Sequence, residues 1–195
     1  MVSAEQVAQF FLACTDPESG DATTHLKLQK LVYYAQAWHL AKHGTPLFPE
    51  TIEAWRHGPA VGSVYQQYKS FGYGAIDVSR AEVPDLPAGV ETHLRWIWDT
   101  YGAYEAWFLS SLTHRESPWI RARAGLPPDS NSGRPIRNEW MTEFYRAMRE
   151  PDLPPRPPIE RPVLHAAEEI ERARHSGEAR IPWEQIRDRP HHAGV

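Results

Sequence analysis

The chain has 195 residues, of which 41% are hydrophobic and 24% charged, and its formal net charge is −4. This composition is typical of a folded soluble domain, and the acidic balance argues against the basic surface that nucleic-acid binding needs. Cys14 is the only cysteine, which excludes an internal disulfide and a multi-cysteine zinc ribbon. The sequence shows no signal-peptide pattern and no apolar stretch of about 20 residues that could span a bilayer, so we expect a cytoplasmic protein without membrane contact.

The first half of the chain has a helical period. Ser3 can begin a helix over 3–14, with Gln6 in the position of a capping box. Thr24 and Gly44 are suited to the two ends of a second helix. This second helix carries apolar residues on opposite faces, which predicts that it packs on both sides and runs through the middle of the domain.

The rest of the domain reads as further helices joined by loops. Residues 46–60 are rich in proline and glycine and are predicted to form a loop, with a short extended piece at 52–55. The loops at 46–60 and 125–135 are candidates for recognition because exposed loops often bind partners. The further predicted helices cover 61–71, 90–101, 104–113, 118–124 and 135–149.

The composition changes after about residue 150. Residues 151–162, PDLPPRPPIERP, contain six prolines, and Trp183 is the one aromatic residue that follows them. Proline neither continues a helix nor donates to a sheet, so this stretch is predicted to be an extended linker. The expected organisation is a helical domain over 1–149, a proline-rich linker over 150–162 and a short helical tail over 163–195.

Two histidines four residues apart, His39 and His43, have the spacing of two zinc ligands on one helix face. A zinc peptidase also needs a glutamate directly after the first histidine, where this chain has Leu40. We therefore interpret His39 as a mostly buried, hydrogen-bonded residue and His43 as a residue favoured near the helix C-terminus. No metal or cofactor is expected.

In the stretch LTHRESPW, the residues Thr113, His114, Glu116 and Ser117 offer a possible nucleophile, base and orienting acid. Groups this close in sequence rarely converge in the geometry of a catalytic triad. We therefore interpret the stretch as a polar corner between two helices. His114 and Glu116 would bind loose backbone groups, Ser117 would cap the next helix and Trp119 would anchor it.

Three segments resemble, in order and spacing, the Panacea domain, a family found in antitoxins of bacterial and phage toxin–antitoxin systems. They are KLQKLVYYAQAWHLAKHGTPLF at 27–48, IEAWRHGPAVGSVYQQYK at 52–69 and FLSSLTHRESPWIRAR at 108–123. The likeness covers about 3–148. The residues that it marks, mainly as structural ones, are Lys27, Leu28, Gln29, Lys30, Leu31, Tyr33, Tyr34, Trp38, His39, Trp55, Gly58, Pro59, Tyr65, Leu109, Ser110, Thr113, His114, Pro118 and Trp119.

The resemblance implies a compact, mainly α-helical domain that binds a partner protein and carries no catalysis. Family members neutralise diverse toxins by direct contact, and one type is an adaptor that delivers its toxin to a bacterial protease. We therefore expect an antitoxin whose toxin is encoded by a neighbouring gene, with the protease adaptor as an alternative and homo-oligomerisation left open. His57 departs from the family pattern before Gly58 and Pro59, and we expect it to contact the partner.

The tail at 163–189 is similar to C-terminal segments of several small antitoxins, which fold along the toxin. It has many charges and too few apolar residues to fold alone, but it could become ordered on a partner. We hypothesise that it binds the toxin or helps to mask the toxin's active site; a helix packed on its own domain and a solvated tail are the alternatives. Its expected anchors are Leu164, Ile170, Ile181, Trp183 and Ile186.

Two other functions are alternatives to protein binding. A hydrolase would use His39, His43 or His114, with or without a metal. A DNA-binding autoregulator would need phosphate contacts, against the acidic balance of the chain. The local basic residues available for such contacts are Arg121, Arg123, Arg134 and Arg137.

Overall fold

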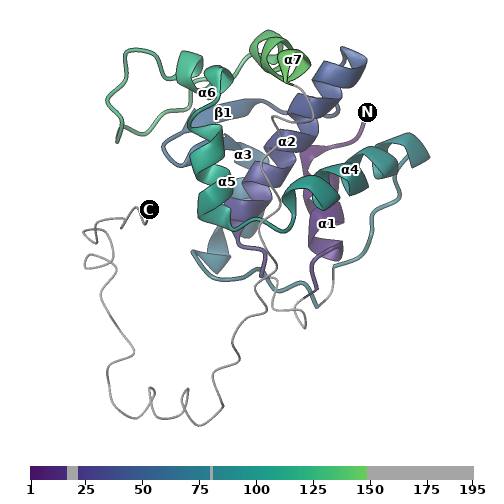
Figure 1. Cartoon of the computed structure of the whole chain (residues 1–195). Coiled ribbons are helices and arrows are strands. Elements are labelled where there is room, and N and C mark those ends of the chain that lie inside the picture. Colours follow the sequence, from purple (N-terminus) through teal and green to yellow (C-terminus); the bar gives the residue numbers. More distant parts are fainter. Residues whose placement is uncertain (17–21, 80, 149–195) are drawn as a thin grey trace, which may run out of the picture. The chain divides into compact units, whose positions relative to one another are not determined.

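The computed structural model describes residues 1–16, 22–79 and 81–148, and this part of the chain is mainly α-helical, as predicted (Figure 1). The proposed linker and tail lie outside the described residues. The elements, in chain order, are α1 (Ala4–Ala13), α2 (His25–His43), β1 (Ile52–Trp55), β2 (Gly58–Val61), α3 (Gly62–Tyr68), the 3-10 helix η2 (Lys69–Phe71), α4 (Ala88–Tyr101), α5 (Ala106–Thr113), α6 (Ser117–Ala122) and α7 (Asn138–Ala147).

Local signals set the ends of the first two helices. The Ser3 hydroxyl accepts a hydrogen bond from the Gln6 backbone, and the Gln6 side chain accepts one from the Ser3 backbone, which completes the predicted capping box. Thr24 caps α2 by accepting from the Lys27 backbone N–H. Gly44 ends α2 with a φ of 72°, a left-handed conformation that glycine adopts without steric cost.

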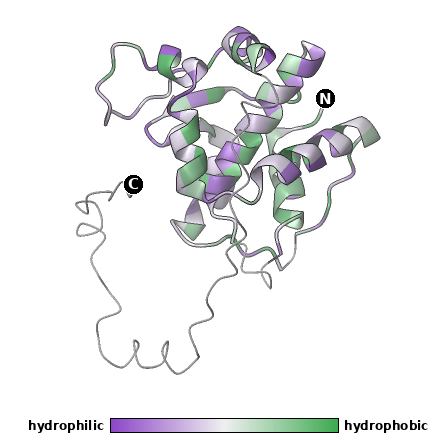
Figure 2. Cartoon of the chain, in the orientation of Figure 1, coloured by the Kyte–Doolittle hydropathy of each residue, from purple (hydrophilic) through white to green (hydrophobic). Residues whose placement is uncertain are grey.

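Helix α2 runs through the middle of the domain, as its two apolar faces predict (Figure 1). It contacts α1, α3, α4, α5, α7 and β2. Every residue from Lys27 to Trp38 is buried, although the colours along the helix alternate between hydrophilic and hydrophobic (Figure 2). Helix α2 therefore buries polar side chains as well as apolar ones, and these polar side chains need partners inside the domain.

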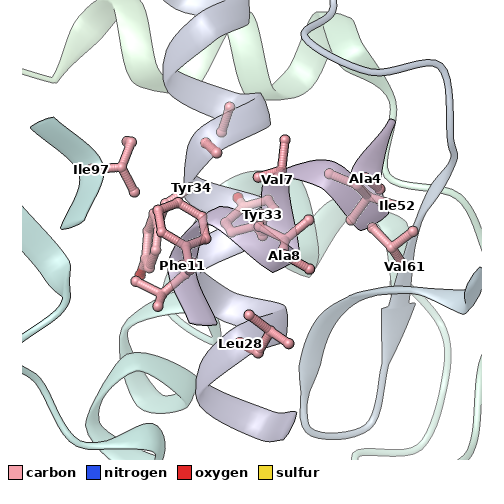
Figure 3. Packing of buried hydrophobic residues seen from close by; sticks show 14 of the residues in the cluster. Ala4, Val7, Ala8, Phe11, Leu28, Tyr33, Tyr34, Ile52, Val61 and Ile97 are labelled. Carbon is pink, nitrogen blue, oxygen red and sulfur yellow. The ribbon is translucent and has the colours of Figure 1, made fainter. Parts of the chain in front are cut away.

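The core forms where α1 crosses α2. Figure 3 shows Val7 and Phe11 of α1 beside Leu28 and Tyr34 of α2, and all four side chains are buried. Tyr101 of α4 stacks on the Tyr34 ring, with ring centroids 4.0 Å apart and planes 5° apart. Aromatic side chains bury much area each, so this layer supplies a large share of the hydrophobic stabilisation.

A two-stranded sheet replaces part of the predicted loop at 46–60. The extended piece expected at 52–55 is present as β1, but residues 58–61 form a second strand, and α3 begins at Gly62. The strands are antiparallel, with Ile52 opposite Val61 and Trp55 opposite Gly58. The remaining predicted helices are present with ends that differ by at most three residues from the expected ones.

Buried glutamines of α2 bind the backbone of this irregular region. Gln29 accepts a hydrogen bond from Val61 N at 2.8 Å and donates to Val61 O at 3.2 Å. Gln36 accepts from Leu47 N at 2.7 Å and donates to Phe48 O at 3.0 Å. Buried backbone groups need partners, and here side chains of the central helix provide them. The polar residues of α2 thus fasten the loop and the sheet to the core.

Arg123 holds the loop at 125–135 in the same way and is not an available phosphate contact. Its side chain is 6% exposed. The guanidinium donates to Ala54 O of β1 at 3.1 Å and to the carbonyls of Pro127, Pro128 and Ser130 at 3.2, 3.0 and 2.9 Å. One of the arginines considered for DNA contact is therefore a structural residue.

None of the helices in the described part of the chain has the length and apolar character that a membrane crossing requires.

We predict that acid destabilises the domain through His93. This α4 residue is 6% exposed, and its Nε2–H donates to Ala35 O of α2 at 2.9 Å. Burial, assisted by Lys42, His39 and His43, lowers the pKa of His93 from 6.5 to about 4. The unfolded chain binds a proton more readily, so the stabilisation by neutral His93 is complete above pH 6.5 and is lost progressively as the pH falls from 6.5 to 4.

The size of this effect follows from the shift in pKa. We expect the unfolding free energy to fall by about 3 kcal/mol between pH 7 and 4 because of His93 alone. Urea denaturation of the unmodified chain and of His93→Gln, which keeps a donor and does not titrate, measures the difference. An identical pH dependence of the two proteins would contradict the prediction.

Candidate partner-binding site

A cavity of about 860 Å³ lies beside the N-terminal half of α2. Its walls come from the β1–β2 sheet, α3, the first turn of α5 and residues 131–133. The sheet positions His57 at its turn, and α5 brings Trp107 next to it, with ring centroids 5.7 Å apart and planes 87° apart. His57, which we expected to contact the partner, therefore lines the cavity as an exposed side chain.

The inner wall of the cavity is aromatic. Trp55 of β1 packs edge-to-face on Tyr65 of α3, with centroids 4.9 Å apart, and His25 of α2 packs on the same tyrosine at 5.6 Å. All three side chains are half-buried. Edge-to-face contacts of this kind hold aromatic rings in defined orientations, so the wall is a rigid, largely apolar surface.

The rim of the cavity carries exposed aromatic side chains that the sequence analysis missed. Trp107 is 62% exposed and Tyr73 is 88% exposed, and both line the cavity. Phe108, which follows Trp107, is 41% exposed. The signal was present in α5: Leu109 and Thr113 are four residues apart and mark its buried face. Trp107 precedes Leu109 by two residues, which places it on the opposite side of the helix.

A buried lysine lies on the inner side of the cavity. Lys30 of α2 is 1% exposed, and its ammonium donates to Pro59 O of β2 at 2.9 Å. Burial lowers the pKa of Lys30 to about 7, although the negative charge of Glu116 opposes this. Gly58 leaves room for this lysine: a Cβ there would lie 2.7 Å from Lys30 Nζ and 2.7 Å from Thr113 Oγ1.

Glu116 accepts hydrogen bonds from three buried tyrosines, and the sequence interpretation of this residue was wrong. The hydroxyls of Tyr33 and Tyr34 from α2 and of Tyr145 from α7 donate to its carboxyl oxygens at 2.6, 3.3 and 2.8 Å. Burial raises the pKa of Glu116 to about 7, opposed by these hydrogen bonds and by Lys30. We had expected Glu116 to bind nearby backbone groups, but residues distant in sequence surround it instead.

The other members of the LTHRESPW stretch have structural partners. His114 Nε2 lies 3.0 Å from Arg56 O, as expected for a residue that binds backbone, and Thr113 donates to Ser110 O at 2.8 Å. Trp119 anchors α6 by donating to Trp55 O at 3.0 Å. Ser117 does not cap this helix, because the N-cap position belongs to Glu116 and no side-chain cap bond forms. The hydroxyl and the imidazole thus each bind a backbone carbonyl.

The histidines with zinc-like spacing lie at the far end of α2. The rings of His39 and His43 are 4.5 Å apart. His39 is less buried than predicted, because α2 is near its end there and His39 Nδ1 lies 2.8 Å from the carbonyl of Thr45 in the following turn. Within residues 1–16, 22–79 and 81–148 no group of three or more His, Cys, Asp or Glu side chains could hold a metal ion.

The residues that the resemblance marked lie mostly inside the domain. Half-buried positions among them are His39, Trp55, Tyr65, His114 and Trp119. The buried ones are Lys27, Leu28, Gln29, Lys30, Leu31, Tyr33, Tyr34, Trp38, Gly58, Pro59, Leu109, Ser110, Thr113 and Pro118. The expected tail anchors, Leu164, Ile170, Ile181, Trp183 and Ile186, lie outside the described residues.

Comparison with known proteins yields one family. The model of the family described as "Antitoxin SocA-like, Panacea domain" matches residues 28–120. This segment runs from α2 into α6 and contains the sheet, the buried lysine and the aromatic rim. No curated protein and no solved structure gives a significant match to the chain.

Proposed function

We propose that this chain neutralises a cognate toxin by direct protein–protein contact, because residues 28–120 belong to the Panacea domain family of SocA-like antitoxins. The observation that best supports this is the exposed aromatic rim of the cavity, where Trp107 and Tyr73 are 62% and 88% exposed. The toxin is expected to be the product of a neighbouring gene, and the encounter to take place in the cytoplasm.

Exposed aromatic side chains of this kind are typical anchors of protein interfaces. Tryptophan and tyrosine are enriched among the few residues that carry most of the binding energy, and they act best in desolvated pockets. A stable interface buries about 800 Å² on each partner. The cavity alone is too small for that, so the contact would extend over the exposed face of α5, including Phe108.

Co-expression with the neighbouring gene product is the first test. If that protein is lethal alone, we expect this chain to restore growth and to co-purify with it. Growth without a stable complex would support the alternative of an adaptor that delivers the toxin to a protease. A harmless neighbour that does not bind would contradict the proposal. The hydrolase alternative requires stoichiometric zinc in the untagged protein, and the DNA-binding alternative requires a salt-sensitive gel shift on the upstream DNA.

Trp107→Ala tests the binding surface. We expect a loss of affinity for the toxin of about 30- to 1000-fold, corresponding to about 2–4 kcal/mol for the removal of a central aromatic anchor. The fold should be unaffected because the side chain is 62% exposed. Val83→Ala is the control, since Val83 is 54% exposed and does not line the cavity. If calorimetry gave Trp107→Ala and Val83→Ala equal affinities for the toxin, this surface would be excluded as the toxin-binding site.

Truncation after Arg149 tests the tail. We propose that residues 163–189 bind the toxin or help to mask its active site, because their few apolar residues and many charges suit a segment that folds on a partner. The shortened chain should bind the toxin more weakly and neutralise it less completely than the full chain does. Unchanged affinity and unchanged growth rescue would show that the tail plays no part in neutralisation.

A further inference from the structure

We propose that the cavity is a carboxylate-binding site, in which Lys30 receives an aspartate or glutamate side chain that the partner protein inserts. The site lies under the aromatic rim to which we assign toxin binding, so the protein origin of the carboxylate rests on the proposed function. The carboxylate site itself rests on four observations of this cavity.

The ammonium group of Lys30 has hydrogen-bond donors that its described partner, the Pro59 carbonyl, does not use. The side chain is 1% exposed and lines the cavity. Its described hydrogen bond goes to Pro59 O at 2.9 Å, whereas an ammonium group has three donors. In the part of the chain that the structure describes, Lys30 forms no ion pair within 4.0 Å. A buried charge without a close counter-charge is costly, and a carboxylate in the cavity would provide one.

The acidic residue that acts on Lys30 electrostatically is committed elsewhere. Glu116 is 6% exposed and accepts hydrogen bonds from Tyr33, Tyr34 and Tyr145. Three donors satisfy most of the acceptor capacity of one carboxylate. The hydrogen bonds thus hold Glu116 among the tyrosines, and the place of an ion-pair partner for Lys30 is open to a ligand.

A second polar atom beside the cavity lacks a partner. Nδ1 of His25 is buried and has no hydrogen bond in the described part of the chain, and the ring lines the cavity against Tyr65. A buried polar atom without a partner costs about 1–3 kcal/mol. Burial, followed by the charge of Lys30, lowers the pKa of His25. A ligand with a polar head could pair with this ring as well as with the lysine.

The shape and charge of the lining fit an acidic side chain on a protein. Gly58 lines the cavity without a side chain that could cover Lys30 Nζ. The other charged lining residues are Arg56 and Lys69 on the basic side and Glu53 and Glu105 on the acidic side, which leaves the lining with one positive charge in excess when Lys30 is protonated. A volume of about 860 Å³ with exposed aromatic residues at the rim accommodates a side chain together with the backbone that carries it.

The first experiment uses the full chain and two matched probes, 3-phenylpropionate and its uncharged amide. Nuclear magnetic resonance titration should show saturable shifts at Gly58 and Trp107, with the acid binding at least about 10-fold more tightly than the amide, the ratio for one charge-assisted hydrogen bond. Lys30→Met should abolish this preference. Lys27→Met should keep it, because Lys27 is equally buried on α2 but lies outside the cavity, over the ring of Trp98.

Equal binding of acid and amide, or no binding at all, would overturn the carboxylate site. A preference for the acid that survives in Lys30→Met would overturn the role of the lysine. If Lys30→Met does not fold, the two probes are compared on the unmodified chain and on His25→Phe. The unmodified chain should prefer the acid to the amide strongly, and His25→Phe should show a weaker preference for the acid.

The second experiment identifies the source of the carboxylate. Each aspartate and glutamate of the co-purified toxin is replaced by its amide, and one replacement should weaken binding at least about 10-fold to the unmodified chain but not to Lys30→Met. A toxin that binds without such a residue would overturn this inference and leave the proposed function intact. Binding of phenylpropionate without binding of the neighbouring protein would uphold the carboxylate site and contradict the proposed function.

Discussion

Glu116→Ala is expected to lower the free energy of unfolding by about 3–5 kcal/mol, because it removes the shared acceptor of three buried hydroxyls. Tyr33 and Tyr145 are 0% and 1% exposed, and water cannot replace the carboxylate at either without opening the core. The substitution also leaves a cavity where the side chain packed, which adds to the loss. Urea denaturation monitored by tryptophan fluorescence measures the change.

Glu116→Gln separates the hydrogen bonds of Glu116 from its charge, and Glu139→Ala is the control for the loss of a carboxylate. Glu116→Gln keeps one acceptor oxygen and should cost clearly less than Glu116→Ala. Glu139→Ala removes an exposed carboxylate from the first turn of α7, and it should change stability by at most about 1 kcal/mol, the usual scale of a surface charge near a helix end. A loss in Glu116→Ala no larger than in Glu139→Ala would contradict the structural role of the tyrosine cluster.

Gly58→Ala is expected to lower the free energy of unfolding by about 2–4 kcal/mol, from backbone strain and steric contact together. The φ of Gly58 is 98°, which L-residues rarely adopt. A Cβ would also lie 2.7 Å from Lys30 Nζ, 2.7 Å from Thr113 Oγ1 and 2.9 Å from Lys30 Cε. Thr113 is a fully buried side chain of α5, so its Oγ1 cannot move into solvent, and a displaced Lys30 would lose its hydrogen bond to Pro59 O.

Gly62→Ala is the matched control for this prediction. Gly62 begins α3, its φ is not positive, and a Cβ there meets nothing within 4 Å. Alanine favours helix over glycine, so this variant should be as stable as the unmodified chain or slightly more stable. Equal stability of Gly58→Ala and Gly62→Ala in thermal and urea unfolding would show that the first position of β2 tolerates a side chain.

Features that depend on neighbours in sequence were predictable. The caps at Ser3, Thr24 and Gly44 work through hydrogen bonds or backbone conformations that span three or four residues, so the sequence determined where α1 begins and where α2 begins and ends. The apolar residues on opposite faces of α2 likewise determined that this helix is central, because a helix with two apolar faces must be covered on both.

Strand β2 and the environment of Glu116 depended on the tertiary structure. The stretch Gly58–Val61 contains a glycine and a proline and lacks the residue pattern of a strand. It is extended because the side chain of Gln29, which precedes Val61 by 32 residues, binds the Val61 backbone. Glu116 is buried because tyrosines 29 to 83 residues away converge on it. Local sequence carries no record of such convergence.

The candidate site likewise combines features that the sequence predicted with features that only the tertiary structure decided. The sequence predicted the family resemblance and the contact of His57 with the partner. The cavity, its aromatic rim at Trp107 and Tyr73 and the buried amine of Lys30 come from the packing of the sheet, α3 and α5 against α2. A helix end or an apolar face follows from interactions within one segment, whereas a binding cavity is the space between segments, and only their arrangement in three dimensions decides which side chains face it.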